Sequence, residues 1–264
     1  MPPKSSKESF EAVPKSERNR SLERGIQILR AFRPGADLLG NGELSDRTGL
    51  PRATVSRLAQ TLVDCGMLEH DRSGRAYRLA APVLSLAHAM RAGSPVLTAA
   101  GPLMRSVAEH RKINVGLAVA DGDEMVYLES VRYSRRVAWR NVVAGQRVPI
   151  ELTSLGRVWL ASVDLPQRNL FLTRLRGRRA SGWKDLSKDI GSAISDVKRL
   201  GYCWACWQPQ VVAIAAPVFD ASERLYALNM SVSGDVSPSD VVEELHEPLL
   251  ALATQIEAAI GRIR

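Results

Sequence analysis

Cysteine and long apolar runs are scarce in this sequence. Its three cysteines, Cys65, Cys203 and Cys206, are an odd number spread along the chain, which excludes the dense disulfide framework of a small secreted domain. No apolar run approaches the roughly 20 residues that span a bilayer, and residues 1–19 lack the apolar segment of a secretory signal. These absences favour a cytoplasmic protein without a membrane partner, and residues 1–19 are predicted to form a disordered arm.

The motifs of common catalytic sites are also missing. The sequence has no phosphate-cradling glycine loop, nucleophile elbow or His-Glu metal motif, and its four histidines are dispersed. Cys203 and Cys206 form a C-x-x-C pair, but no second pair completes a zinc site. We therefore expect no enzyme, cofactor or metal. A DNA-tethered redox or thiol switch that uses Cys203 and Cys206 remains an open alternative.

What the sequence does have is length and positive charge. Its 264 residues exceed one ordinary domain of roughly 150 residues, so two domains are expected. The net charge of +8 favours a polyanionic partner, such as nucleic acid or an anionic membrane surface. Basic residues exceed acidic ones by four both in residues 1–80 and in residues 81–264. The charge is therefore denser in the shorter N-terminal part, which favours that part as the anion-binding one.

The first eighty residues show the order of a winged helix-turn-helix. Ser21 is a good N-cap for a helix that ends at Pro34-Gly35, and a short second helix is expected from Glu43 to Arg47. A third helix is predicted over Pro51 to Cys65, before a hairpin around Arg72-Ser73-Gly74. Each of these helices and the hairpin can be explained without DNA binding, for example as an element with one solvated face. Their combination in this order favours DNA binding.

The third helix has an apolar stripe and an opposite polar face. The stripe consists of Val55, Leu58, Ala59, Leu62 and Val63, spaced as one buried helix face. Such a helix can present its first turns to base edges in the major groove, while arginines of the hairpin reach phosphates or the minor groove.

Two segments, SLERGIQILRAF at residues 21–32 and TGLPRATVSRLAQTL at residues 48–62, resemble the DNA-binding region of IclR-type bacterial transcription regulators. The resemblance implies double-stranded operator DNA as a partner. It also places Arg52, Thr54, Ser56 and Arg57 on or beside the base-reading surface. Gln60 on the outer face of the helix, and Arg72 and Arg75 in the hairpin, complete the predicted DNA-binding set.

The remaining chain predicts a linker helix and an α+β domain. We assign residues 20–80 to the winged helix-turn-helix, residues 81–94 to the linker helix and residues 95–264 to an effector-binding and oligomerisation domain. Hairpins are expected around Asp121-Gly122 and around Ala221-Ser222-Glu223. With the helical stretches between and after them, they predict an antiparallel sheet with flanking helices. A helical linker can transmit a rearrangement to paired DNA readers, or can be ordinary packing or dimer surface.

This order is similar to the GAF-like effector domain of IclR-type regulators, notably at DGDEMVYLE, residues 121–129, and VPIELTSLGRVWLAS, residues 148–162. The family binds small organic acids in a cup above the sheet, and the resemblance implies cup positions for Ser154, Leu155, Ala213, Ser231 and Ser233. Ser154 and Leu155 are expected to precede a helix and offer N–H groups to a carboxylate. A plain helix cap and water-facing serines are the structural alternatives.

The sequence departs from the family after Gly201-Tyr202, where many members carry an acidic run. This chain has CWACWQPQ instead and is about two residues shorter, so the position of the acidic pocket residue falls near Ala205 or Cys206. A more apolar pocket for a larger or aromatic acid is one interpretation. A degenerate, ligand-free pocket is the other. In either case a homodimer or tetramer is expected, because operators usually engage two symmetric readers.

Overall fold

The structure, a computed structural model, describes residues 19–133, 142–179 and 181–261. Apart from Asn19, the arm predicted over residues 1–19 lies outside the described residues. The chain divides into two compact units, the first ending at Ala89 and the second beginning at Met90. None of the helices formed by the described residues combines the length and the apolar character that crossing a bilayer requires.

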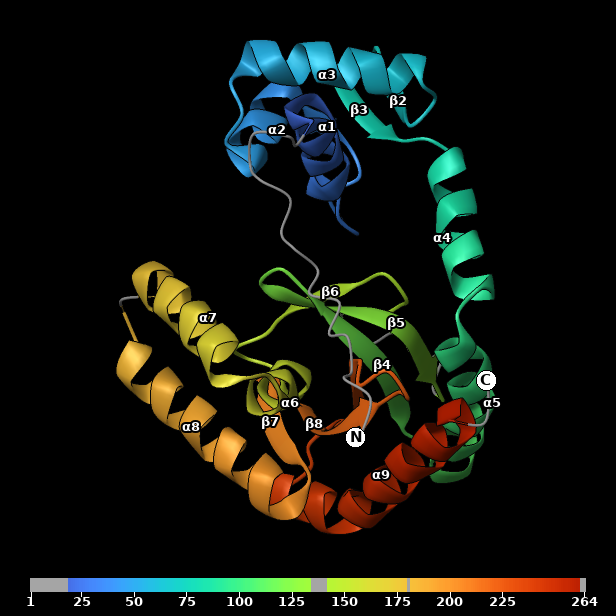
Figure 1. Cartoon of the computed structure of the whole chain (residues 1–264), viewed down its shortest axis with the longest axis vertical. Helices are drawn as coiled ribbons and strands as arrows, with labels where there is room; N and C mark the ends of the chain where they lie inside the picture. The colour runs from blue at the N-terminus through green and yellow to red at the C-terminus, as the bar shows by residue number, and fades with distance from the viewer. Residues whose placement is uncertain (1–18, 134–141, 180, 262–264) are drawn as a thin grey trace, which may run out of the picture. The chain divides into compact units, whose positions relative to one another are not determined.

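The first unit combines helices with a small sheet (Figure 1). Its elements are α1 (Arg20–Ala31), β1 (Leu39–Gly40), α2 (Asn41–Thr48), α3 (Arg52–Asp64), β2 (Leu68–Asp71) and β3 (Ala76–Leu79). The strands pair antiparallel in the order β1-β3-β2, so that β2 and β3 form the wing. The predicted winged helix-turn-helix is confirmed. Sequence analysis missed β1, because two residues are too few to show a period.

The helix starts of this unit differ from the predictions. Asn19 caps α1 in place of Ser21, since its side-chain oxygen accepts hydrogen bonds from the backbone N–H groups of Ser21 and Leu22 at 3.1 Å each. The second helix starts two residues before the predicted Glu43. The Glu43 carboxylate accepts a hydrogen bond from the Gly40 N–H group at 2.9 Å, and this bond stabilises the earlier start.

The core of the first unit forms between its helices. Ile28 of α1, Leu44 of α2, and Val55 and Ala59 of α3 have no exposed surface, and Leu58 is 8% exposed. The apolar stripe predicted on the third helix is therefore confirmed. Because that stripe is buried, the opposite face of α3 is left for solvent or a partner.

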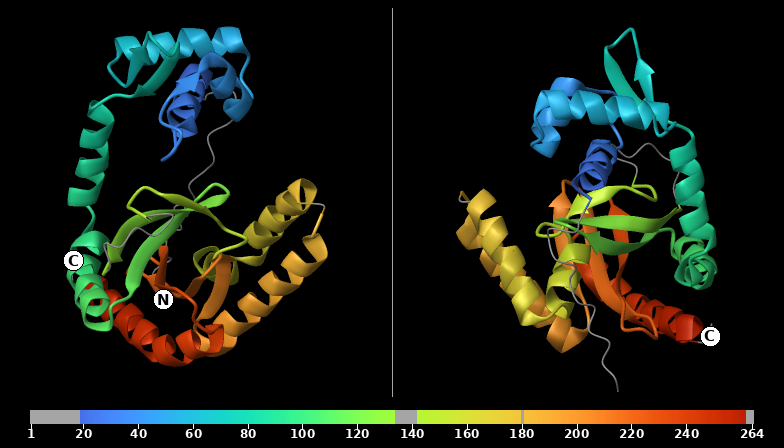
Figure 2. Two further views of the ribbon diagram at one scale, coloured as in Figure 1. Left: turned by 180° about the vertical axis from the view of Figure 1, so that it is seen from behind. Right: turned by 45° about the horizontal axis from the view of Figure 1, so that its top comes forward.

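The second unit is an α+β domain. After α4 (Pro82–Ala92), its elements are α5 (Pro95–Arg111), β4 (Asn114–Asp121), β5 (Glu124–Arg132), β6 (Arg147–Pro149), α6 (Ser154–Ser162), α7 (Leu165–Arg178), α8 (Trp183–Leu200), β7 (Cys203–Gln208), β8 (Val211–Phe219), β9 (Leu225–Ser233) and α9 (Pro238–Gly261). The strands pair antiparallel in the order β6-β5-β4-β9-β8-β7. Figure 2 shows the ribbon of this unit, with its strands and helices, from two further directions. The predicted fold class and both predicted hairpins are confirmed, whereas β6, α7 and β7 were not predicted.

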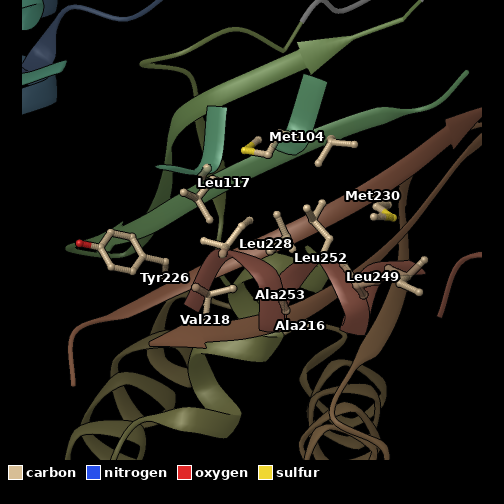
Figure 3. Packing of buried hydrophobic residues seen from close by; sticks show 14 of the residues in the cluster. Met104, Leu117, Ala216, Val218, Tyr226, Leu228, Met230, Leu249, Leu252 and Ala253 are labelled. Carbon is tan, nitrogen blue, oxygen red and sulfur yellow. The ribbon is translucent and has the colours of Figure 1, made fainter. Parts of the chain in front are cut away.

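Helices cover both faces of this sheet. On one face, Met104 of α5 and Leu249 of α9 are fully buried in one cluster with Leu228 of β9 (Figure 3). On the other face, Val158 of α6 and Ile190 of α8 belong to a second buried cluster. Successive residues of a strand point to opposite faces. The same strands therefore contribute alternate residues to the two clusters.

Candidate functional site

The outer face of α3 is polar and basic. The predicted residues Arg52, Ser56, Arg57 and Gln60 are exposed there, with Thr54 half-buried beside them. The Gln60 amide nitrogen donates a hydrogen bond to the Asp64 carboxylate at 2.8 Å, so base contact by Gln60 would exchange this bond for another. A helix with such a face can enter the major groove, where arginine reads guanine through paired hydrogen bonds.

The position of α3 is set by the turn that precedes it. Gly49 ends α2 with a φ of 70°, a left-handed conformation that favours glycine. The Ser45 hydroxyl donates a hydrogen bond to the Leu50 carbonyl at 2.6 Å. The Arg47 guanidinium donates to the Ala31 carbonyl at the end of α1 at 3.0 Å. These bonds tie α2 to the end of α1 and to the turn that leads into α3, and neither Ser45 nor Arg47 was predicted to have this role.

The turn between β2 and β3 presents both predicted wing arginines, Arg72 and Arg75, to solvent. Asp71 organises this turn, because its carboxylate accepts hydrogen bonds from the Ser73 hydroxyl at 2.5 Å, the Ser73 N–H group at 3.0 Å and the Gly74 N–H group at 3.3 Å. The bonds from the Ser73 side chain and the Gly74 backbone lower the pKa of Asp71. Sequence analysis missed Asp71, although an Asp before Ser and Gly is typical of such turns.

The second unit contains a hollow of about 1050 Å³. Ser231 and Ser233, two predicted effector residues at the end of β9, line it. Lys112 and Arg132 are the charged side chains among the described lining residues, and both are cations. Further lining residues are Gly116, Tyr127, Ser130, Trp207, Gln208 and Asn229. The hollow therefore favours an anionic ligand with polar groups.

The predicted residues Ala213 and Ala205 continue from Ser231 across the sheet. Ser231 of β9 pairs in register with Ala213 of β8, and Ala213 pairs with Ala205 of β7. Directly paired residues share one face of an antiparallel sheet, so the three side chains form a row. Among the described residues, the lining of the hollow includes Ser231 but neither alanine.

The structure places Ser154 and Leu155 inside the N-terminal end of α6. They form the first turn of α6 instead of preceding it, and the N-cap is Thr153, whose hydroxyl accepts a hydrogen bond from the Gly156 N–H group at 3.2 Å. Each is 1% exposed, and neither belongs to the described lining of the hollow. The start of α6 is pressed against the preceding chain, since a Cβ on Gly156 would lie 2.1 Å from the Ile150 carbonyl oxygen.

Cys203 and Cys206 do not form a pair. Cys203 is buried and Cys206 is exposed, as alternation along β7 requires, and both thiols are free. Residues three apart in a strand lie about 10 Å apart, whereas a disulfide joins Cα atoms about 4.4–6.8 Å apart. Burial raises the pKa of the Cys203 thiol to about 12. The arrangement gives no support to a switch that joins the two thiols, and it places Cys206 on the face opposite Ser231.

Two lining residues that sequence analysis missed are Tyr127 and Asn229. Burial raises the pKa of the Tyr127 hydroxyl to about 12, while a hydrogen bond with the Asn229 side chain lowers it. The hydroxyl is therefore neutral at physiological pH. Asn229 precedes Ser231 by two residues on β9, so the alternation that grouped Ser231 with Ser233 was the signal that could have found it.

Two family models match the chain. The one described as the IclR helix-turn-helix domain matches residues 21–72, and the one described as the bacterial transcriptional regulator IclR C-terminal domain matches residues 88–258. The two matches fall on the winged helix-turn-helix and on the α+β domain.

Similar proteins are transcription regulators and not enzymes. The Pca regulon regulatory protein of Pseudomonas putida is 30% identical over 241 residues, which cover 89% of this chain and 81% of that protein. The crystal structure of an IclR family transcriptional regulator from Brucella abortus has a TM-score of 0.84 at 31% identity and covers 93% of this chain and 94% of that one. An IclR homolog from Microbacterium hydrocarbonoxydans, complexed with 4-hydroxybenzoate, shares the fold at 22% identity and a TM-score of 0.69, covering 91% and 98%.

Proposed function

The chain belongs to the IclR family of bacterial transcription regulators, and we propose that a small organic acid, with aromatic acids among the candidates, controls its binding to operator DNA. It is a DNA-binding regulator with a C-terminal effector domain. We assign DNA binding to residues 20–80, the linker to residues 81–94, and effector binding and oligomerisation to residues 95–264. We assign the protein to the cytoplasm, where bacterial DNA lies.

The exposed basic face of α3 is the observation that carries the DNA-binding site. We assign base reading to Arg52, Thr54, Ser56, Arg57 and Gln60. Arg72 and Arg75 are assigned to the DNA backbone or the minor groove. The buried apolar stripe leaves this face of α3 free for a duplex.

Anisotropy titrations with a DNA site selected from a randomised pool test this assignment. A base contact contributes about 1–3 kcal/mol, so Arg57→Ala is expected to raise Kd for the selected site about 5- to 150-fold. Kd for random DNA is expected to change much less. Arg176→Ala, which removes an exposed charge from α7 in the other unit, is the matched control. An unchanged Kd for Arg57→Ala on both DNAs would refute the assigned reading helix.

The hollow with its cationic side chains supports an acid as effector. We assign ligand contact to Ser231 and Ser233. Ala213 and Ala205 extend the floor on the same face, while the buried Ser154 and Leu155 and the outward Cys206 are less suited to contact. The homolog that was crystallised with 4-hydroxybenzoate favours aromatic acids. Thermal-shift measurements with aromatic and aliphatic acids test the proposal, since a ligand of the folded state raises Tm. A Tm unmoved by every acid would favour the degenerate-pocket alternative.

A contact between strand β5 and the linker helix supports control of DNA binding from the hollow. Tyr127 and Ser130 of β5 line the hollow. The guanidinium of Arg91, near the end of α4, donates hydrogen bonds to the Leu128 carbonyl and, at 2.7 Å, to the Glu129 carboxylate on that strand. A ligand that shifts β5 would therefore shift the end of α4 as well.

Exposed apolar side chains support assembly with a second copy of the chain. Leu22 and Ile26, one turn apart on α1, are 63% and 46% exposed, and Leu86 and Met90, one turn apart on α4, are 60% and 52% exposed. Apolar pairs of this kind favour burial, and a symmetric operator requires two readers. We assign a homodimer or tetramer. Light scattering of the Leu86→Glu variant is expected to show a smaller species than the wild type.

A further inference from the structure

Asn229 carries an unused hydrogen-bond acceptor next to the hollow. The residue is 5% exposed, and its side-chain oxygen, Oδ1, has no hydrogen-bond partner among the described residues. Native proteins leave few buried polar atoms unpaired, because each such atom has lost its hydration without replacement. Asn229 lines the hollow in the second unit, so a molecule held there is placed to supply the missing donor.

Tyr127 and Gly116 are close neighbours of Asn229. A hydrogen bond with the Asn229 side chain lowers the pKa of Tyr127, and Oδ1 is the Asn229 atom without a hydrogen-bond partner among the described residues. Gly116 of β4 makes the arrangement sterically feasible, since a Cβ there would lie 2.5 Å both from Asn229 Oδ1 and from Tyr127 Cε1.

The same hollow has a hydrogen-bond donor without a partner and, separately, two cationic side chains. The Gln208 amide nitrogen, Nε2, is also buried without a hydrogen-bond partner in the described part of the chain, and Gln208 belongs to the lining. Lys112 and Arg132 contribute the positive charge, and Trp207 contributes an aromatic surface. A ligand that satisfies these groups combines a donor for Asn229 with an anionic acceptor for Gln208 and the cations.

We propose that Asn229 determines effector specificity by accepting a hydrogen bond from a hydroxyl group of the ligand, so that the effector is a hydroxylated carboxylic acid. The carboxylate faces Gln208 and the cationic side chains. This inference rests on the proposed function, because it requires the hollow to be the effector site. The inference goes beyond that function because it predicts tighter binding of hydroxy acids than of the same acids without a hydroxyl donor.

Calorimetric titration of the full chain with matched acids tests the inference. Benzoate, 3- and 4-hydroxybenzoate and the two corresponding methoxybenzoates form one series, in which the ether oxygen keeps the bulk and removes the donor. A second series compares butyrate with 3-hydroxybutyrate. We expect a hydroxy acid to bind the wild type at least about tenfold more tightly than its methoxy or unsubstituted counterpart, in line with one hydrogen bond to a buried partner.

The Asn229→Leu variant, similar in volume but without the acceptor, is expected to bind the members of a series within about threefold of one another. Ser195→Ala on α8 is the control that keeps the preference, because the Ser195 hydroxyl donates its hydrogen bond to the Gly191 carbonyl of its own helix, at 3.1 Å. Should Asn229→Leu fail to fold, Asn229→Ala replaces it with the same expectation, since it also lacks the acceptor. A preference that persists in the folded variant belongs to another lining residue and overturns the inference. Equal binding of hydroxy and non-hydroxy acids by the wild type overturns the inference and leaves the proposed function intact. Absence of binding by every acid overturns both.

Discussion

Arg168 is the residue for which the structure makes its sharpest stability prediction. It lies on α7, is 8% exposed, and directs its guanidinium at the end of α6. It donates hydrogen bonds to the carbonyl oxygens of Leu160, of Ala161 at 2.9 Å and of Val163 at 3.0 Å. The last carbonyls of a helix lack intrahelical partners and carry partial negative charge. Arg168 therefore caps α6 from a neighbouring helix.

The expected cost of removing this side chain follows from those three bonds. A hydrogen bond to a charged group contributes about 1.5–3 kcal/mol, but the three bonds share one guanidinium whose desolvation offsets part of the gain. Arg168→Ala also leaves three carbonyls with little access to water. We therefore expect a loss of about 3–5 kcal/mol in the free energy of unfolding, the range found when one partner of a buried charged contact is removed. Such a loss is a large part of a typical stability of about 5–15 kcal/mol.

Urea unfolding followed by tryptophan fluorescence measures this loss. All five tryptophans lie after residue 138, so the signal reports the second unit. Arg174→Ala on the exposed side of α7 is the matched control and is expected to change stability by less than about 0.5 kcal/mol. Arg168→Lys keeps the charge but not the planar guanidinium with its several donors. Its loss in the free energy of unfolding is expected to lie between those of Arg168→Ala and Arg174→Ala. If Arg168→Ala unfolds at the same urea concentration as the control, the capping argument is wrong.

Three further predictions concern the same unit. Gly156→Ala is expected to destabilise it by about 3 kcal/mol or more, measured by urea unfolding, because the new Cβ would lie 2.1 Å from a backbone oxygen; a stable variant would refute the close approach. Cys203, with a pKa of about 12, is expected to resist a thiol reagent at pH 8 until the protein unfolds, while the other two cysteines react, as mass spectrometry can show. Tyr127 has a pKa raised from 10.0 to about 12, so its stabilising contribution is present below pH 10 and is lost as pH rises toward 12. A late step in the 295 nm titration that survives Tyr127→Phe would contradict this assignment.

The winged helix-turn-helix was predictable because its signals are local. The stripe of Val55, Leu58 and Ala59 has helical spacing, and Gly49 marks the turn before it. Both features depend on residues within a few positions of one another. The wing hairpin was predictable for the same reason. The cap of α1 was misassigned to Ser21, because both Asn19 and Ser21 are good caps and only the backbone geometry selects one.

The effector hollow was predictable only in part. Alternation along one strand grouped Ser231 with Ser233, and both line the hollow. Asn229 of β9 and Tyr127 of β5 come together because both strands pair with β4. The two residues are more than a hundred positions apart in the sequence. Ser154 and Leu155 were placed in the cup by resemblance, whereas packing against the preceding chain buries them at the start of α6.

The amino-acid sequence by itself determined the family, the order of helices and hairpins, and the solvent-exposed and buried faces of α3. Each of these depends on periodicity and turn chemistry within short stretches. Only the tertiary structure decided which strands adjoin, that Cys203 and Cys206 point apart, and that Asn229, with an unpaired side-chain oxygen, lines a hollow that also has cationic side chains. Strand order and helix packing bring together residues that no local pattern relates, and the chemistry of the hollow is a product of that assembly.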